Sequence, residues 1–186
     1  MKKSLLILLL ISVSFIFETL AQQSGWFWLN PKPHLIDQEA VMFPTPNIGY
    51  ACGAYASVLK TTDAGATWMV KRTGYNYNLN TIFFIDENNG WAAGGTWLLL
   101  GNQCKIIHTT DGGETWYEQN PTINGQVFSM FFTSANNGVA VCESGKILKT
   151  SDGGNNWVLV PSGETAQQRS VSLRMLTPVT LLLQII

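Results

Sequence analysis

Charged residues are scarce in this chain of 186 residues, and neither sign dominates. Lysine and arginine together number 11, aspartate and glutamate number 12, and the formal net charge is −1. This balance provides neither the basic surface that nucleic-acid binding requires nor an acidic run. We therefore expect no nucleic-acid partner.

The residue patterns that hold a metal ion, a cofactor or a nucleotide are also missing. His34 and His108 are isolated, and no spacing of cysteine, histidine and acidic residues is typical of a metal site. No glycine-rich loop leads into a helix, as a nucleotide-binding loop requires. No apolar stripe recurs with the helical period of about 3.6 residues. We expect no metal, no cofactor and no helical layer.

The sequence does contain a repeat. We use the name corner motif for three similar segments, Thr62–Trp68, Thr110–Trp116 and Ser151–Trp157. Upstream of each one, a phenylalanine lies six residues before a glycine: Phe43 and Gly49, Phe84 and Gly90, Phe132 and Gly138. The phenylalanines are 41 and 48 residues apart, a period that suits four short strands per repeat.

The middle repeat predicts four strands joined by turn residues. The strands are expected at Thr81–Ile85, Gly90–Gly94, Lys105–Thr109 and Thr115–Gln119. A four-stranded antiparallel meander of this kind is the blade of a β-propeller.

We therefore predict an all-β propeller of about three blades within residues 22–168. The blades are expected at residues 40–76, 80–122 and 126–161. Because closed rings contain ~4–8 blades, the propeller should be incomplete, an open arc.

The acids, glycines and tryptophans of the corner motifs are expected to be structural. Each carboxylate can accept backbone N–H groups of a tight turn, each glycine can supply a positive φ, and each tryptophan can fold over the turn. An acid repeated at the same place in every blade is not expected to be catalytic, because one active site needs one constellation. The residues are Asp63, Gly65, Trp68, Asp111, Gly113, Trp116, Asp152, Gly154 and Trp157.

The three cysteines are expected to be buried, unpaired thiols. Cys52 and Cys142 fall on the same strand of different repeats, and Cys104 makes the number odd. Strands in separate blades do not bring Cα atoms within the ~4.4–6.8 Å that a disulfide requires.

The corner motif, Ser/Thr-x-Asp-x-Gly-x-x-Trp, resembles the Asp-box, or bacterial neuraminidase repeat. Tyr50–Gly53, Gly90–Gly94 and Ile106–Trp116 look more specifically like the photosystem II stability/assembly factor family of propellers, over about residues 25–160. In such families the Asp-box lies at the blade periphery, away from the ligand. Similar repeats occur in sialidases, xyloglucan hydrolases and sortilin-type receptors. The photosystem family is thought to use a basic patch for its partner, whereas this chain has few arginines.

The N-terminus is typical of a secretory signal. Met1–Lys3 precedes the apolar run Leu5–Phe17, and cleavage is expected near Ala21. We therefore expect a secreted, periplasmic or cell-surface protein with no membrane span after cleavage. The alternative is a membrane anchor, for which the run falls short of ~20 apolar residues.

Two further segments bear on how complete the propeller is. Residues 25–31 match Trp116–Pro121 in the offsets of tryptophan, asparagine and proline, which predicts an orphan outermost strand. Residues 169–186 lose the repeat pattern, which predicts a truncated or frame-shifted start of a fourth blade. A C-terminal strand that caps the array is the alternative.

The candidate binding residues lie on the face opposite the corner motifs. In a meander blade, the loop between the second and third strands shares this face with the connections between blades. A seven-residue insertion there carries Trp97, which could stack on a sugar or anchor a peptide, or instead pack over a neighbouring blade. Tyr75, Asn76 and Tyr77, which follow the first blade, are weaker candidates.

We predict an exported, non-catalytic propeller module that binds a protein or a glycan. The alternative is a fragment of a secreted glycoside hydrolase of the xyloglucanase or sialidase-like type. A sialidase needs an arginine cluster, yet Arg72 is the one arginine in the repeats. A glycosidase needs two carboxylates across a cleft, and no acidic pair stands apart from its repeat equivalents. An assembly role like that of the photosystem family is a third hypothesis.

Overall fold

The predicted all-β fold is confirmed in a computed structural model of the chain. It describes residues 36–96 and 103–162 in full and the backbone of residues 171–177 and 180–185, all within the unit Lys32–Ile186. These residues form strands and two short 3₁₀ turns, and none of their helices could cross a membrane. The predicted signal peptide (1–21), the orphan strand (25–31) and Trp97 lie outside the described residues.

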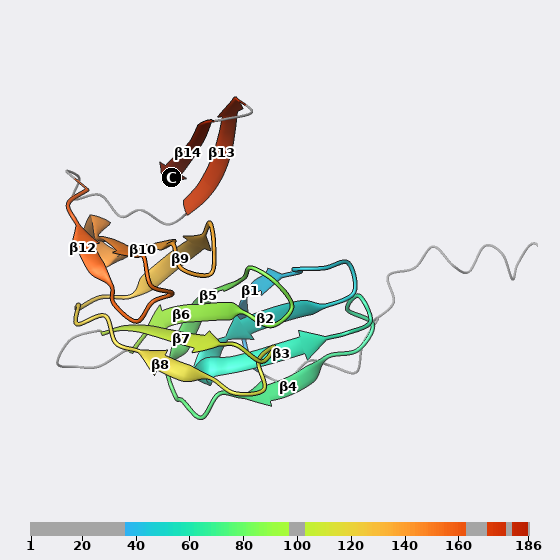
Figure 1. The fold of residues 1–186 in the computed structure, drawn as a ribbon. Coiled ribbons are helices and arrows are strands. Elements are labelled where there is room, and N and C mark those ends of the chain that lie inside the picture. The colour runs from blue at the N-terminus through green and yellow to red at the C-terminus, as the bar shows by residue number, and fades with distance from the viewer. Residues whose placement is uncertain (1–35, 97–102, 163–170, 178–179, 186) are drawn as a thin grey trace, which may run out of the picture. The chain divides into compact units, whose positions relative to one another are not determined.

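The strands form three four-stranded antiparallel sheets, each with its strands in sequence order (Figure 1). The first blade contains β1 (Gln38–Met42), β2 (Gly49–Gly53), β3 (Ser57–Thr61) and β4 (Met69–Arg72). The second contains β5 (Asn78–Phe84), β6 (Gly90–Gly95), β7 (Cys104–Thr109) and β8 (Tyr117–Gln119). The third contains β9 (Val127–Phe132), β10 (Gly138–Cys142), β11 (Ile147–Thr150) and β12 (Val158–Val160). They are the meanders expected of an incomplete propeller.

A separate two-stranded antiparallel sheet follows the blades. It pairs β13 (Val171–Thr177) with β14 (Thr180–Ile185). That this region is the truncated or frame-shifted start of a fourth blade stays a prediction.

The spacing of phenylalanine and glycine in the repeat has a direct structural cause. In every blade a phenylalanine at or just after the end of the first strand packs its ring against the first glycine of the second strand. A Cβ atom at Gly49, Gly90 or Gly138 would lie 2.5, 2.4 or 2.5 Å from that ring. The tryptophan of the same blade's corner motif meets the ring edge-on, with centroids 6.0, 6.1 and 6.0 Å apart. Each blade is therefore built around the same stack of glycine, phenylalanine and tryptophan.

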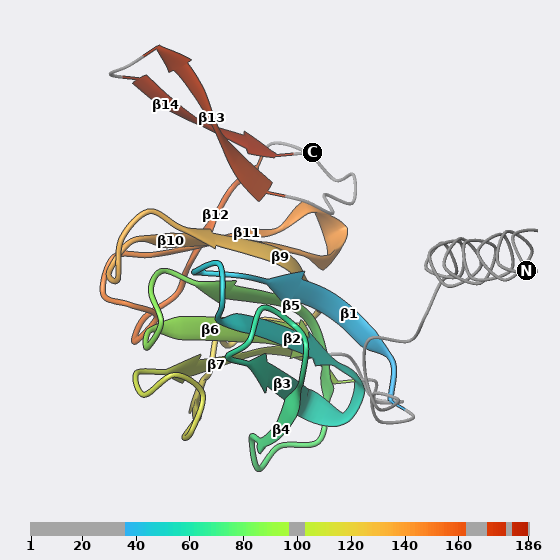
Figure 2. The same ribbon diagram turned by 90° about the vertical axis from the view of Figure 1, so that its right-hand side faces the viewer.

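The hydrophobic core lies between blades, in two clusters. One cluster joins the first and second blades and the other joins the second and third, so the middle blade lies between its neighbours (Figures 1 and 2). All six residues of β6 are buried, as its composition of glycine, alanine and tryptophan predicts for close approach of neighbouring sheets.

One aromatic side chain fastens the first blade to the second. The Tyr50 ring of β2 stacks on Phe84 of β5, with centroids 3.6 Å apart and planes at 6°. Its hydroxyl donates to the carbonyl oxygens of Glu87, at 3.0 Å, and Gly112, at 3.1 Å. The Gly112 carbonyl belongs to the corner motif and also accepts from Lys60 Nζ at 2.8 Å. The ring thus packs on β5 of the next blade, and the hydroxyl bonds to two of that blade's turns.

The second and third blades repeat this contact with a different aromatic residue. Trp91 of β6 stacks on Phe132 of β9, with centroids 3.7 Å apart. Its Nε1 donates to the carbonyl oxygen of Gly153, in the third corner motif, at 3.0 Å. We call this recurring contact the aromatic joint.

Removing the hydroxyl of the joint should weaken the protein without disturbing the stack. We expect Tyr50→Phe to lower the free energy of unfolding by about 1–2 kcal/mol, because the one hydroxyl proton shared by the Glu87 and Gly112 carbonyls is lost and the Glu87 carbonyl loses a donor. Urea unfolding measures the change. Tyr117→Phe, at a side chain that is 64% exposed, is the matched control and should stay within about 0.5 kcal/mol of the parent. Equal effects at the two positions would contradict the joint.

Candidate functional site

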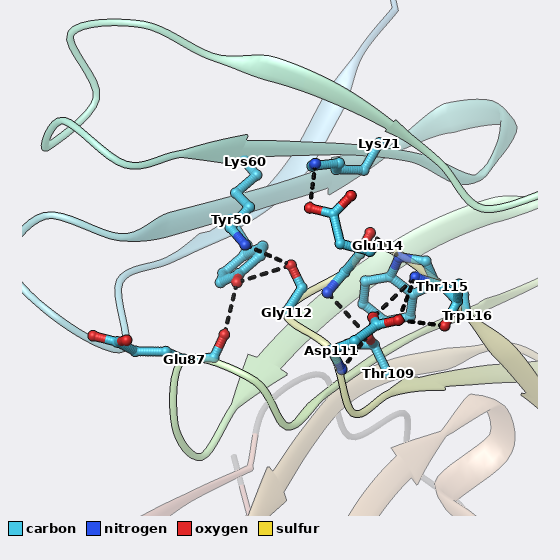
Figure 3. A network of polar contacts seen from close by, with 11 residues as sticks. Tyr50, Lys60, Lys71, Glu87, Thr109, Asp111, Gly112, Glu114, Thr115 and Trp116 are labelled. Atoms are coloured by element: carbon cyan, nitrogen blue, oxygen red, sulfur yellow. Dashed lines mark hydrogen bonds and ion pairs between the residues drawn. The ribbon is translucent and has the colours of Figure 1, made fainter.

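The corner motifs form one end of the blades, and their aspartates act as acceptors within tight turns (Figure 3). In the second blade, Asp111 accepts from the Thr115 N–H at 2.9 Å and from the Thr115 hydroxyl at 2.5 Å. Thr109 donates its hydroxyl to Asp111 at 2.8 Å and accepts from the N–H of Gly113 at 2.9 Å. The carboxylate thus accepts hydrogen bonds from the backbone and the side chain of its own turn.

The other two motifs repeat this network. Asp63 accepts from the N–H of Thr67 at 2.8 Å, and Asp152 accepts from the N–H of Asn156 at 2.9 Å. A buried threonine two residues before each aspartate completes the turn, at Thr61, Thr109 and Thr150. The pattern Ser/Thr-x-Asp-x-Gly-x-x-Trp includes these threonines, although no role was predicted for them.

The motif glycines adopt backbone angles that favour glycine. Gly65, Gly113 and Gly154 have φ values of 90°, 84° and 92°. In the second blade, Trp116 folds back so that its Nε1 donates to the Gly113 carbonyl at 3.2 Å. Trp116 is buried, whereas Trp68 and Trp157 of the outer blades are half-buried.

These hydrogen bonds lower the pKa of the motif aspartates. Bonds from Thr67 and Thr61 lower the pKa of Asp63 to about 2. Burial would raise the pKa of Asp111, but bonds from Thr115 and Thr109 outweigh it and lower the value to about 2. Bonds from Asn156 and Thr150 lower the pKa of Asp152. The folded state therefore favours the ionised form of all three.

Acid should destabilise the protein through these aspartates. A carboxyl whose pKa is lower in the folded state contributes stability above its unfolded value of about 4, and loses that contribution as the pH falls to about 2. We expect the melting temperature to drop across this window. The triple variant Asp63→Asn, Asp111→Asn, Asp152→Asn should melt lower at neutral pH and depend less on pH between 4 and 2. A triple variant with an unchanged pH profile would contradict this role.

A cleft of about 520 Å³ lies at the opposite end of the first two blades. Its residues come from the segment before β1, the β2–β3 turn, the β4–β5 connection and the end of β6. All of these share one end of an antiparallel meander. The lining residues are Asp37, Ala54, Tyr55, Asn76, Tyr77, Asn78 and Thr96.

A rigid turn presents Tyr55 at this cleft. Tyr55 has a left-handed backbone, with φ 55° and ψ 34°, and its side chain is 69% exposed. Its N–H donates to the Asn78 side-chain oxygen at 3.4 Å, and the next N–H, of Ala56, donates to the Tyr77 carbonyl at 2.5 Å. The second blade therefore holds the turn in which the first blade exposes an aromatic ring.

The absence of a side chain at Gly53 lets the segment around Asp37 lie close to this turn. A Cβ atom there would lie 1.9 Å from the Asp37 carbonyl oxygen, which accepts from the N–H of Ala54 at 3.0 Å. Only a glycine allows the β1 segment to approach so closely. The Asp37 side chain is exposed and supplies the one carboxylate of the lining.

The structure separates the predicted candidates of the β4–β5 connection. Asn76 and Tyr77 line the cleft, whereas Tyr75 does not. Tyr75 stacks on Tyr77, with centroids 5.6 Å apart, and its hydroxyl accepts from the Glu118 N–H at 2.9 Å. Tyr75 thus supports the cleft from behind.

Tyr77 is buried and has an unusual hydroxyl. Its side chain is 8% exposed, and its hydroxyl has no hydrogen bond of good geometry among the described residues. Burial, followed by the charge of Glu118, raises its pKa. Tyr77 is therefore a neutral wall of the cleft, with Glu118 close to its hydroxyl.

The sequence analysis missed four polar or aromatic lining residues: Asp37, Tyr55, Asn78 and Thr96. The repeat alignment does mark Tyr55, because it occupies the same loop position as Ser144 of the third blade. Both residues have a left-handed backbone, and the φ of Ser144 is 61°. The described part of the chain contains no cluster of three or more His, Cys, Asp or Glu side chains that could hold a metal ion.

The family profile of "Photosynthesis system II assembly factor YCF48" matches residues 26–165, most of the chain. The chain belongs to the YCF48 family. Among curated protein sequences, no relative matches it.

Solved structures show the same fold. A structure described as YCF48 bound to D1 peptide is 22% identical with a TM-score of 0.62, over 75% of this chain and 44% of that one. YCF48 from Cyanidioschyzon merolae is 25% identical with a TM-score of 0.57, over 69% and 41%. An ancestral GH74 enzyme is 19% identical with a TM-score of 0.57, over 80% and 21%. This YCF48-family chain spans less than half the length of the two YCF48 structures.

Proposed function

We propose that this chain is a non-catalytic binding module that holds an extended peptide segment of a partner protein in the cleft. The observation that carries the proposal is the rigidly held, 69% exposed Tyr55 at a cleft lined mainly by uncharged polar groups. Because backbone hydrogen bonds already hold this turn, its main chain loses little entropy when a ligand packs on Tyr55.

The lining suits a polypeptide backbone. The amides of Asn76 and Asn78 and the hydroxyl of Thr96 can both donate and accept hydrogen bonds, as a peptide chain requires. A solved YCF48 is described as bound to a D1 peptide. This supports a peptide as the class of ligand for the present chain.

The charge of the lining favours a neutral or basic segment. Among the described residues that line the cleft, Asp37 is the one carboxylate and none is a lysine or an arginine. An acidic segment would find no positive partner among these residues. The presence of a single carboxylate in the described lining also disfavours glycoside hydrolysis in this cleft, because that reaction uses two carboxylates.

Selection from a phage-displayed library of linear peptides tests the proposal. We expect enriched peptides that lose binding at least tenfold with Tyr55→Ser, because the aromatic contact is removed. Serine occupies the same left-handed position at Ser144, so the turn should be kept. Tyr117→Ser, at an exposed tyrosine of β8 that does not line the cleft, is the matched control and should bind as the parent does.

Three outcomes would overturn the proposal. Peptides that bind Tyr55→Ser as tightly as the parent would place the site elsewhere. A glycan array with Tyr55-dependent signal, together with no enriched peptide, would favour the glycan-binding alternative. Release of reducing sugar from xyloglucan by the purified chain would establish the hydrolase alternative.

We also propose that the protein is exported. The support is the Met1–Phe17 sequence pattern alone, which lies outside the described residues. N-terminal sequencing of the protein from its native cell should give Gln22 as the first residue. A mature protein that still begins at Met1 would contradict cleavage.

A further inference from the structure

Two cysteines from different blades meet in the core. Cys104 is the first residue of β7 in the second blade, and Cys142 is the last residue of β10 in the third. Both belong to the hydrophobic cluster between these blades, where they are 2% and 0% exposed, and each thiol is the leading influence on the pKa of the other. The sequence analysis expected no such neighbour for either residue.

The backbone holds both ends of this contact on one segment, the connection between β8 and β9. The N–H of Cys104 donates to the Ile123 carbonyl at 3.1 Å. The N–H of Glu143, directly after Cys142, donates to the Gln126 carbonyl at 2.8 Å. Because Ile123 and Gln126 are three residues apart, the two cysteine-bearing strand ends are fixed side by side.

The surroundings favour a thiolate at one of the two positions. The hydrogen bond from Cys142 lowers the pKa of Cys104 against its burial, and the charge of Lys146 adds to this effect. The same pairing raises the pKa of Cys142. A thiolate beside a protonated thiol is the arrangement from which thiol–disulfide exchange proceeds.

We propose that Cys104 and Cys142 form a disulfide that joins the second blade to the third when the chain meets a disulfide oxidant. Cys52 is buried in the other cluster, between the first and second blades, and remains a free thiol. This pairing goes beyond the proposed peptide binding and does not depend on it.

The oxidant is a low-molecular-weight disulfide of the glutathione class. The thiolate of one cysteine attacks a sulfur atom of the oxidant, which forms a mixed disulfide and releases one thiolate. The other cysteine then loses its proton to solvent and attacks the protein sulfur of the mixed disulfide, which releases the second thiolate. Two protein thiols are thereby oxidised to one disulfide, and one molecule of oxidant is reduced to two thiols.

Burial determines when this exchange takes place. Neither sulfur is accessible once the second and third blades are packed together, so the bond forms as the two blades come together during folding. The finished bond is shielded from reductant for the same reason. It then constrains the unfolded chain, which is the main way that a disulfide stabilises a protein.

Peptide mapping tests the pairing directly. The full chain is unfolded, refolded with oxidised and reduced glutathione, alkylated in denaturant and digested with trypsin. The lysine and arginine positions place each cysteine on a different peptide, with Cys104 on Thr73–Lys105 and Cys142 on Ile106–Lys146. We expect these two peptides to be linked and Cys52 to be alkylated. Three alkylated cysteines, or a link that involves Cys52, would overturn the proposal.

Variants give a second readout. The melting temperature of the oxidised chain should exceed that of the reduced chain by on the order of 5–10 °C. Cys52→Ala, the matched control at another buried cysteine, should keep this difference, and Cys104→Ala should abolish it. If Cys104→Ala does not fold, the map of the parent chain and of Cys52→Ala still decides the question. A redox-dependent shift that persists in folded Cys104→Ala would contradict the pairing.

Discussion

The aromatic joint is the contact on which the rest of the architecture depends. In the first and second blades, one side chain of the second strand stacks on the phenylalanine of the next blade and donates a hydrogen bond to that blade's corner motif. Tyr50 and Trp91 achieve the same result with different chemistry, a hydroxyl and an indole N–H. The joint requires a rigid corner to present a carbonyl, and that explains why each aspartate is occupied within its own turn. The ring stack and the hydrogen bond of each joint together fix the angle between consecutive blades.

The two ends of the blades follow different rules as a result. At the corner end, the same hydrogen bonds recur in every described blade, so the three turns have the same structure. At the opposite end, the loops differ: the first blade exposes Tyr55 where the third has Ser144. The cleft and the Cys104–Cys142 contact both lie among these variable connections. A repeat protein can change its binding surface there without altering the joints that hold the blades.

Much of the fold could be predicted because its causes are local and periodic. The offset between Phe84 and Gly90 records a ring lying on a backbone, and the corner motif records a turn with its own acceptor. The candidate site was only partly predictable. The order of strands in a meander predicted that Asn76 and Tyr77 lie at the end of the blades where the cleft is found, whereas Tyr75 does not line it. Asp37 and Thr96 are far apart in the chain, and no periodic pattern marks their meeting.

The sequence by itself determined the blade: four strands, their turns and the stack of glycine, phenylalanine and tryptophan inside each one. These features arise from contacts within a single repeat, and the residues that make the contacts recur in each of the three repeats. Only the tertiary structure decided which side chains meet between blades, including Tyr55 with the β4–β5 connection and Cys104 with Cys142. The physical reason is that such contacts depend on how far one sheet is rotated and offset against the next, and packing of the whole core sets that relation.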